Sequence, residues 1–550
     1  MSLRPDALGP VPEETARVAC AAFPKGHRYL RLRDELGTIY EDARFASLFP
    51  TQGRPAEAPW RLALVTVLQF AEGLSDRQAA DAVRDRLAWK YLLGLEVTDT
   101  GFDFTILGDF RARLVEGRAE QHLLEALLDR CKALGLVKRR GKQRTDSTHV
   151  LAAVRALNRL EGVGETLRYA LNTLAAVVPD WLRMQVPPDW YDRYGRRIEN
   201  TRLPEAQSER DALAATIGAD GVYLLTAVYS TAAPTWLREV PAVQTLRQMW
   251  LRHYHAPDAA SGIMRLRAPQ DLPPSALLQE SPYDPDARFH TKRDTSWTGY
   301  TVHLTETCDG DTPDLITQVS TVAASTNDVE VTGAIQADLA ARDLLPGEHL
   351  VDAGYVSGQH LLASTTTYGI DLVGPAPPDT SWQAATEEGV GVARFVIDWD
   401  AHTVTCPRGK TTRPWSDGTT KDGRLFHQVR FAKADCLTCP LRAHCTRSAT
   451  EPRQLSLRPR AEHVALQLAR QRQTTADFTA RYKKRAGVEG TIGQGVRGGG
   501  LRRARYRTLP KVHLEHVAIA AGICLQRLDD WWTETPRGTT RRSRFAALAA

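Results

Sequence analysis

The sequence predicts a multidomain α/β protein built around a mixed β-sheet, with helical and cysteine-rich parts attached to it. Three observations lead to this prediction. The chain has 550 residues, which is too long for a single hydrophobic core. Segments with strand and helix periodicity alternate in its central and C-terminal parts, as in a sheet covered by helices. Purely helical patterns fill two other regions, and half of the eight cysteines lie between residues 406 and 445.

The composition is that of an ordinary globular protein, with 42% hydrophobic and 25% charged residues. The formal net charge of +6 is modest, so the basic residues matter only where they cluster. The N-terminus lacks a basic and apolar signal sequence, and no apolar run approaches the length of a membrane span. We therefore expect a soluble intracellular protein without a membrane partner. Residues 1–40 carry little further signal and are assigned to an N-terminal arm.

Residues 41–136 are predicted to form a helical domain. One helical pattern ends at Gly73, and Ser75 with Gln78 forms a capping box at the start of the next helix. A third helix is expected over 104–116. A helix-turn-helix unit that binds DNA fits this pattern, and a bundle used for packing or dimerisation fits it equally well. The arginines expected to be exposed on these helices are Arg77, Arg84 and Arg86.

The basic segment 137–150, VKRRGKQRTDSTHV, leads into the first predicted strand of the sheet. We expect this strand to end near Asp146 and a helix to follow over 151–164. Taken alone, Asp146 is more typical of a helix cap than of a metal ligand. Residues 155–283 are predicted to be an inserted helical region, and they contain no chemical motif.

From residue 284 the hydrophobic period changes to that of strands. Residues 299–308 alternate apolar and polar side chains, and a turn joins them to a second strand over 315–325, which predicts a hairpin. A capped amphipathic helix is expected over 326–345, and one more strand over 369–376. Between them a short apolar strand ends on Asp352. A carboxylate at the carboxyl end of a buried strand lies where open α/β sheets bind ligands.

The most basic stretch of the chain is 481–507, with nine Lys or Arg and the single acid Glu489. The residues before it predict a helix on which Tyr482, Arg485 and Glu489 face the same way, at positions i, i+3 and i+7. Glu489 could simply pair with Arg485. A carboxylate among cations that hold phosphates would instead require a metal ion. The residues expected on the buried side of this helix are Leu466, Leu468, Phe478 and Tyr482.

The segment 377–455 is predicted to be a second insertion, rich in cysteine. Cys436 and Cys439 have the spacing of half a zinc site. Cys406 and Cys445 could complete a closed tetrahedral site, with His444 and His427 as substitutes. Such clustering in an intracellular chain favours structural zinc over free thiols.

The order of these elements is that of a ribonuclease H-like core with two insertions. Asp146, Asp352 and Glu489 come from three separate elements of this core, and three converging carboxylates would bind two divalent metals. Carboxylate oxygens suit Mg²⁺ or Mn²⁺. The ranges assigned to the core are 137–154, 284–376 and 456–530, and the basic tail covers 531–550.

With these motifs in place, the chain resembles bacterial insertion-sequence transposases of the DDE class, in the subgroup with a Tyr-Arg-Glu signature. Tyr482, Arg485 and Glu489 match that signature, RTDSTHV resembles the motif of the first Asp, and HLVDAGY resembles that of the second. The lysine that the family places seven residues after the Glu falls on Val496, and Arg497 follows it. The N-terminal helices and the cysteine cluster also resemble parts of this group.

The resemblance implies a cytoplasmic, nucleoid-associated enzyme. It would cut DNA at terminal inverted repeats and join the freed 3′-hydroxyls to target DNA, working as a homodimer in a synaptic complex. Asp146, Asp352 and Glu489 would hold two metals. The side chains expected to contact DNA are Tyr482, Lys483, Lys484, Arg485, Arg497, Arg502, Arg503 and Arg505.

Three alternatives remain at this point. A ribonuclease H-like nuclease would cut DNA without joining it. A non-catalytic remnant of a transposase would only bind DNA, and all three carboxylates argue against it. A zinc-dependent transcription regulator would leave the layout of the carboxylates unexplained.

Overall fold

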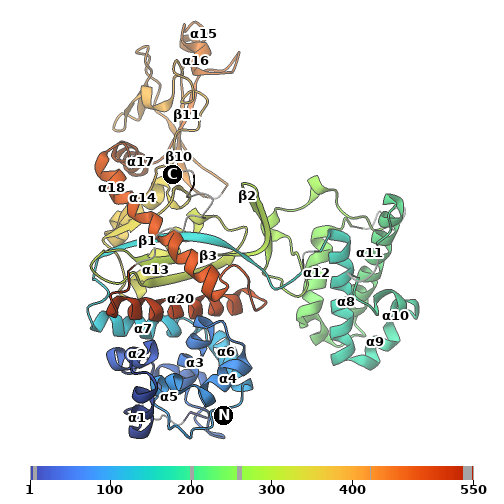
Figure 1. The fold of residues 1–550 in the computed structure, drawn as a ribbon. Helices are drawn as coiled ribbons and strands as arrows, with labels where there is room; N and C mark the ends of the chain where they lie inside the picture. The colour runs from blue at the N-terminus through green and yellow to red at the C-terminus, as the bar shows by residue number, and fades with distance from the viewer. Residues whose placement is uncertain are drawn as a thin grey trace.

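The computed structural model describes residues 2–3, 9–155, 157–198, 203–256, 263–421, 423–536 and 548. Figure 1 shows a central sheet with helix α20 (Leu509–Trp532) beneath it and the N-terminal helices below α20. A group of helices lies to one side, next to β2, and the cysteine-rich segment extends from the end of the molecule opposite the N-terminal helices. The basic tail predicted from residue 531 lies mostly outside the described residues.

The N-terminal helices follow the predicted pattern. The capping box of Ser75 and Gln78 is present at the start of α4, and Gly73 makes the preceding turn with φ of 68°. The third expected helix is α6, with Asp103 accepting hydrogen bonds from Thr105. The helices are α1 (Glu13–Ala22), α2 (Arg28–Leu36), α3 (Pro59–Ala71), α4 (Asp76–Asp85), α5 (Leu87–Leu93), α6 (Thr105–Glu116) and α7 (His122–Ala133).

Helix α3 is a packing element. It is almost entirely buried, and it packs on α20 so closely that a Cβ on Gly522 would lie 2.9 Å from the Cβ of Ala71. The packing role offered as an alternative to DNA binding therefore applies to α3. Arg77, Arg84 and Arg86 are exposed, as predicted, on or just after α4.

The central sheet is mixed. Strand β3 pairs antiparallel with β1 on one side, and with β2 and then β4 on the other. Strands β1, β5 and β6 are parallel neighbours, so the order is β2 or β4, β3, β1, β5, β6. The predicted hairpin is β3–β4, whereas β2 was not predicted. The strands are β1 (Lys142–Leu151), β2 (Arg288–Lys292), β3 (Thr295–Thr307), β4 (Ile316–Ala323), β5 (Glu348–Leu350) and β6 (Asp371–Val373).

The prediction for the end of the first strand was wrong. Strand β1 continues past Asp146 to Leu151, because the antiparallel ladder with β3 runs from Gln143 opposite Thr307 to Leu151 opposite Gly299. The helix expected at 151–164 begins only at Arg159, where Asn158 caps it. Asp146 is therefore not a helix cap.

Helices cover both faces of the sheet. The helix predicted before the basic stretch is divided into α17 and α18, because the side chain of Thr475 caps a new start. Leu466 and Phe478 are buried as expected, but Leu468 is exposed. The covering elements are α13 (Asp328–Ala341), α14 (Gly358–Tyr368), α17 (Arg460–Arg472), α18 (Ala476–Tyr482), the 3₁₀ turn η8 (Lys483–Ala486), α19 (Gly487–Gln494) and the π-helical turn η9 (Gly495–Gly499).

The helical insertion has its own hydrophobic cluster. Within the described ranges, α11 is the one helix long and apolar enough to match a membrane span. A single such helix is weak evidence, because core helices pass the same test. Gly218 and Gly221 bring it against Tyr254 and Trp250 of this cluster. The helices are α8 (Arg159–Val177), α9 (Pro179–Gln185), α10 (Asp189–Tyr194), α11 (Gln207–Tyr229) and α12 (Pro241–His253).

The cysteine-rich segment forms a three-stranded sheet, a two-stranded sheet and two short helices around a small cluster of buried residues. Its elements are β7 (Val396–Asp398), β8 (Thr403–Thr405), β9 (Ser416–Thr419), β10 (Leu425–Arg430), α15 (Lys433–Leu437), α16 (Arg442–Cys445) and β11 (Gln454–Leu457).

Candidate active site

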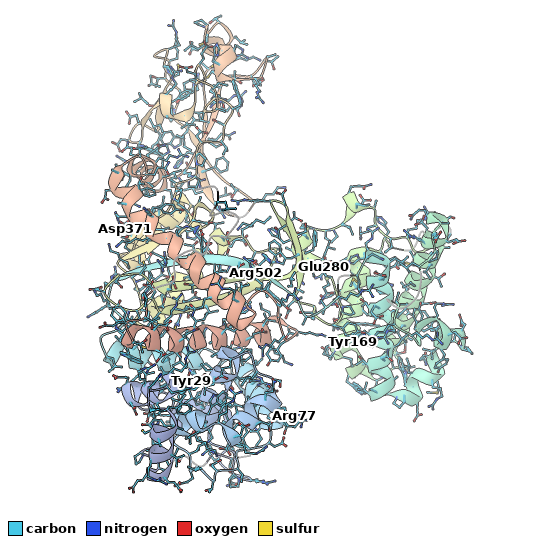
Figure 2. The ribbon with its side chains drawn as sticks, in the orientation of Figure 1. Tyr29, Arg77, Tyr169, Glu280, Asp371 and Arg502 are labelled. Carbon is cyan, nitrogen blue, oxygen red and sulfur yellow. The ribbon has the colours of Figure 1, made fainter. Side chains whose placement is uncertain are left out.

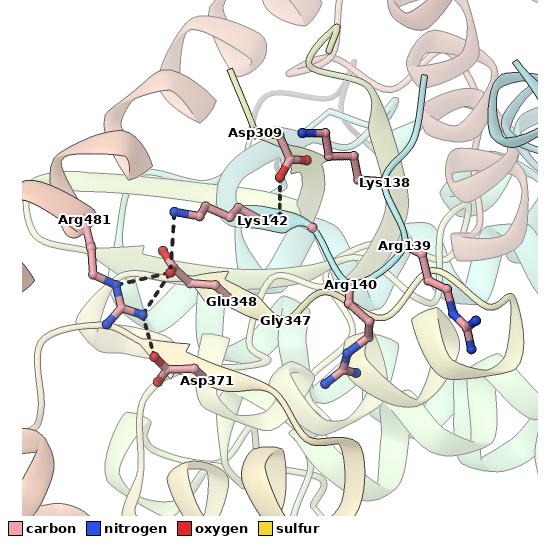
Figure 3. Close-up of a pocket in the computed structure, with 10 residues that line it drawn as sticks. Lys138, Arg139, Arg140, Lys142, Asp309, Gly347, Glu348, Asp371 and Arg481 are labelled. Carbon is pink, nitrogen blue, oxygen red and sulfur yellow. Dashed lines mark hydrogen bonds and ion pairs between the residues drawn. The ribbon is translucent and has the colours of Figure 1, made fainter. Parts of the chain in front are cut away.

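One continuous segment, α18–η8–α19, lies diagonally across the strands of the sheet. Near the end of α18, Arg481 pairs with Glu348 of β5 and Asp371 of β6 (Figure 3). One turn later Arg485 reaches Asp146 of β1, at 3.0 Å. Near the end Thr491 donates a hydrogen bond to Glu306 of β3, at 2.5 Å. The segment that carries Glu489 is thus fixed to four strands.

Asp146 lies in the middle of β1, on the face that this segment covers. Its carboxylate accepts one hydrogen bond from the backbone N–H of Ser147, at 2.8 Å, and pairs with Arg485. Burial raises the pKa of Asp146. The Ser147 N–H and the Arg485 charge oppose this rise, and the charges of Asp352 and Glu489 add to it. All three predicted carboxylates therefore interact electrostatically at this point.

Asp352 follows β5 by two residues, at the carboxyl end of the parallel strands. It caps the short 3₁₀ helix η6 (Ala353–Tyr355), accepting a hydrogen bond from the N–H of Gly354 at 2.8 Å. A cap explains this one contact. The cap does not use the second carboxylate oxygen, which accepts no hydrogen bond from the residues that the structure describes.

Glu489 lies in the first turn of α19, and its side chain is 65% exposed. Arg485 lies between it and Asp146, at 3.5 Å from Glu489. The guanidinium of Arg485 also lies over the ring of Tyr482, 6.0 Å from its centroid. Tyr482, Arg485 and Glu489 thus share one face of the segment. The ion pair of Glu489 with Arg485, considered as the alternative to metal binding, is present.

A buried network of charged residues on β1, β3 and α20 contacts the segment α18–η8–α19 from the side of the sheet. Glu306 is fully buried, and its two oxygens accept hydrogen bonds from Arg144 at 2.6 Å and from Arg527 at 2.6 Å. Arg144 also donates to the carbonyl of Lys484 at 2.7 Å. A Cβ on Gly487 would lie 2.1 Å from the Arg144 guanidinium, so a glycine is required where the chain crosses it. Sequence reasoning missed this network.

The basic residues predicted to contact DNA are exposed except Arg485, whose side chain is 15% exposed, and some also make contacts within the protein. Arg502 donates to Thr148 of β1, and Arg505 donates to the carbonyl of Leu74. Figure 2 shows Arg502 beside the sheet and Arg77 on the N-terminal helices. Arg497 lies on the π-helical turn, with its guanidinium near Gly493, on the same side of the helix as Glu489. The exposed members of the set are Lys483, Lys484, Arg497, Arg502, Arg503 and Arg505.

A cavity of about 440 Å³ lies at the amino ends of the parallel strands β1, β5 and β6, which we call the amino edge of the sheet (Figure 3). Its carboxylates are largely paired. Burial alone would raise the pKa of Asp371, but hydrogen bonds from Arg472 and Arg481 outweigh it, so the pKa is lowered. The cavity is lined by Lys138, Arg139, Arg140, Gly141, Lys142, Asp309, Gly347, Glu348, Asp371 and Arg481.

Asp352 follows the carboxyl end of β5, and we call this end of the parallel strands the carboxyl edge of the sheet. Sequence reasoning missed two residues there. Asp328, the first residue of α13, pairs with Lys292 of β2 at 3.0 Å. In the sequence Asp328 has the signature of an ordinary acid in the first turn of a helix. Lys292 lies in a strand that was not predicted.

In the described part of the chain, no three His, Cys, Asp or Glu side chains are grouped so that they could hold a metal ion. At the triad, the guanidinium of Arg485 occupies the space between Asp146 and Glu489. The donor atoms are all carboxylate oxygens, which is the chemistry that Mg²⁺ and Mn²⁺ prefer. The residues therefore fit these metals by donor type.

The four cysteines of the second insertion lie near one another. Burial raises the pKa of Cys445, and Cys436, Cys439 and Cys406 raise it further against the opposing charge of Arg453. The two histidines predicted as substitutes pair with carboxylates: His427 with Asp417 and His444 with Glu388.

Comparison with protein families gave two matches. Residues 18–113 match the family described as "Transposase domain (DUF772)", which covers most of the N-terminal helices. Residues 405–529 match the family described as "Transposase DDE domain", which covers the cysteines, Glu489 and most of α20. Comparison with curated proteins and with solved structures gave no match. The two family matches support an insertion-sequence transposase, an enzyme that acts on DNA.

Proposed function

We propose that this protein is the DDE transposase of a bacterial insertion sequence, with a ribonuclease H-like catalytic core. It would cut DNA at the terminal inverted repeats and join the 3′-hydroxyl ends to target DNA. One observation carries this proposal. Asp352 and Glu489, from two other elements of the core, both raise the pKa of Asp146, and a segment with exposed cations carries Glu489. The strand order β4, β3, β1, β5, β6, with β3 antiparallel, supports the proposed core.

The roles of the residues follow from their charges. Asp146, Asp352 and Glu489 would hold two Mg²⁺ or Mn²⁺ ions. When bound, such ions lower the pKa of the attacking hydroxyl and neutralise charge on the leaving oxygen. Arg485 balances the carboxylates in the present structure, and it would turn to a phosphate oxygen when metals replace it. The exposed cations from Lys483 to Arg505 would bind the DNA backbone.

The cysteine cluster is proposed to bind structural zinc through Cys406, Cys436, Cys439 and Cys445. Four thiolates would close the coordination sphere, which excludes a catalytic role for this ion. The test is metal analysis of the purified protein. One zinc per chain, lost in Cys436→Ser, is expected, and a chain without zinc whose thiols all react with a thiol reagent would contradict the proposal.

The remaining features of the proposal concern assembly. A homodimer would bring two transposon ends together in the bacterial cytoplasm, associated with the nucleoid. The N-terminal helices and the helical insertion would contribute protein or DNA contacts to that complex.

The function is tested with a labelled duplex that carries the element's own terminal repeat, incubated with Mg²⁺ or Mn²⁺. We expect nicking at the repeat and joined products, both lost in Asp352→Asn and Glu489→Gln while end binding is kept. Nicking without joined products would favour a nuclease. Tight binding without cleavage in any form would favour a DNA-binding remnant.

A further inference from the structure

A fourth carboxylate, that of Asp328, lies beside the proposed triad. Its Oδ2 and the Oδ1 of Asp352 lie 2.9 Å and 3.0 Å from one and the same point, where a Cβ on Gly354 would be. Asp328, Asp146 and Asp352 also all raise the pKa of Tyr355, after burial, the main cause. Asp328 therefore belongs to the same edge of the sheet as the triad, although it comes from α13 on the other face.

Buried polar groups fix the position of Asp328. Ser147, next to Asp146 on β1, donates a hydrogen bond to its Oδ1 at 3.0 Å. His303 lies opposite Ser147 on β3, fully buried, and its Nδ1 is 3.9 Å from the same oxygen. The hydroxyl of Tyr355 lies 2.6 Å from this ring nitrogen. The side chain of Asp328 is only 11% exposed, so its carboxylate is held firmly in place.

The partner of Asp328 is a lysine that reaches in from solvent. Lys292 is the last residue of β2, next to the turn of the β2–β3 hairpin, and its side chain is 55% exposed. Its Nζ lies 3.0 Å from Asp328 Oδ2, the same oxygen that approaches Asp352. The ammonium is thus fixed next to the triad while the rest of the side chain stays accessible.

The carboxyl edge therefore has a cation on each side. Arg485 balances Asp146 from the helical segment, and Lys292 balances Asp328 from the hairpin. An ion pair with an exposed partner contributes little to stability, so it exchanges readily when another anion arrives. A phosphodiester at the triad would bring its non-bridging oxygens to this ammonium.

We propose that Lys292 contacts a phosphate of the DNA strand next to the scissile bond and that Asp328 positions its ammonium for this contact. The inference deepens the proposed function and rests on it, because the ligand is the same DNA strand. Lys292 thereby supplies a cation on the side of the site opposite to Glu489. A lysine suits this role, because its compact charge binds a single phosphate oxygen without a second contact.

The test uses end duplexes in which single phosphates around the cleavage site are replaced, one at a time, by uncharged methylphosphonates. Equilibrium binding is measured in EDTA and cleavage in Mn²⁺, for the wild type, Lys292→Gln and Lys292→Arg. Lys410→Gln is the matched control, since Lys410 is 57% exposed and pairs with Asp435 at 3.1 Å in the cysteine-rich segment.

We expect one methylphosphonate to weaken wild-type binding several-fold and to have no effect on Lys292→Gln. The slope of log K against log salt should fall by about 0.9 in Lys292→Gln, as for the loss of one phosphate contact. Lys292→Arg and Lys410→Gln should keep the wild-type slope, and Lys292→Gln should cut the DNA at least tenfold more slowly.

The binding data decide the inference even if no form of the protein cuts DNA, in which case the proposed function fails by itself. An unchanged slope, with every methylphosphonate affecting Lys292→Gln as it affects the wild type, would overturn the role of Lys292. So would cleavage by Lys292→Gln at the wild-type rate.

Discussion

The amino and carboxyl edges of the central sheet both carry aspartates, but the pKa of the aspartate is lowered at one edge and raised at the other. At the amino edge, Glu348 and Asp371 share Arg481, and hydrogen bonds from Arg472 and Arg481 lower the pKa of Asp371. At the carboxyl edge, burial and two neighbouring acids raise the pKa of Asp146 in spite of Arg485. At the amino edge arginines lower the pKa of the neighbouring carboxylate Asp371, whereas at the carboxyl edge the pKa of Asp146 stays raised.

We attribute this difference to two roles: a structural ion-pair clamp of Arg481 with Glu348 and Asp371, and the proposed reactive centre at the carboxyl edge. The cavity of about 440 Å³ lies at the amino edge, where ion pairs and hydrogen bonds from Arg472 and Arg481 outweigh the effect of burial on Asp371. The carboxyl edge has excess negative charge that a divalent cation would relieve. Cavity size alone points to the amino edge, whereas the direction of the pKa shifts points to the carboxyl edge, where the active site is proposed.

The largest expected effect is on cleavage at the carboxyl edge. Asp352→Asn should lower the rate of DNA cleavage on the order of 1000-fold, because it removes a metal ligand that acts in the transition state. Asp371→Asn is the matched change at the amino edge, and the cleavage rate per folded molecule should stay within about twofold of wild type. A large loss of cleavage in Asp371→Asn would end the distinction between the edges.

The buried network should give the largest effect on stability. Glu306→Ala leaves Arg144 and Arg527 without their shared carboxylate, which should lower the free energy of unfolding by about 3–5 kcal/mol. Urea denaturation followed by circular dichroism measures this change. The control is Glu451→Ala, which removes an exposed partner of Arg430 and should change stability by less than about 1 kcal/mol. Equal losses in the two variants would contradict the role given to Glu306.

The two edges should respond to pH with opposite signs. The pKa of Asp371 is lowered by folding, so its stabilisation is present above the unfolded pKa and is lost as the pH falls through the folded pKa. The pKa of Asp146 is raised, so its contribution is fully present below the unfolded pKa and is lost as the pH rises through the folded pKa.

Urea denaturation of Asp371→Asn and Asp146→Asn from pH 3 to pH 7 checks these signs. Relative to wild type, the deficit of Asp371→Asn should shrink as the pH is lowered. The stability of Asp146→Asn relative to wild type should be greatest at neutral pH and should decline toward acid. Parallel curves for the two variants would show that their environments do not differ.

The smallest expected effect comes from removing the ion pairs of Arg481 at the amino edge. Arg481→Ala removes the ion pairs to Glu348 and Asp371, but Asp371 is 39% exposed, so solvent screens part of the interaction. We expect a loss of about 1 kcal/mol in unfolding free energy and unchanged cleavage at saturating metal. A higher metal requirement in Arg481→Ala would show that the clamp also positions Glu489.

Features with local signals were predictable from the sequence. The capping box at Ser75, the β3–β4 hairpin and the strand before Asp352 each depend on residues close together in the chain. The single face of Tyr482, Arg485 and Glu489 follows from helical spacing, and the structure shows their contacts. The roles of these residues in catalysis and DNA binding stay predictions.

The parts that the sequence did not reveal depend on distant partners. Strand β1 continues past Asp146 because β3 pairs with it from about 160 residues away. Glu306 meets Arg144 and Arg527 across 162 and 221 residues, so no local pattern marks it. Lys292 reaches Asp328 only because β2 folds back on β3.

The most direct test of the central claim is to locate the metal. Fe²⁺ replaces Mg²⁺ in the protein, and ascorbate with peroxide then cuts the polypeptide close to each bound ion, with the fragments identified by mass spectrometry. The account predicts cuts near residues 146, 352 and 489, lost in Asp352→Asn and kept in Asp371→Asn. Cuts near residues 309, 348 and 371, or no cuts that depend on Asp352, would contradict a metal-binding carboxyl edge.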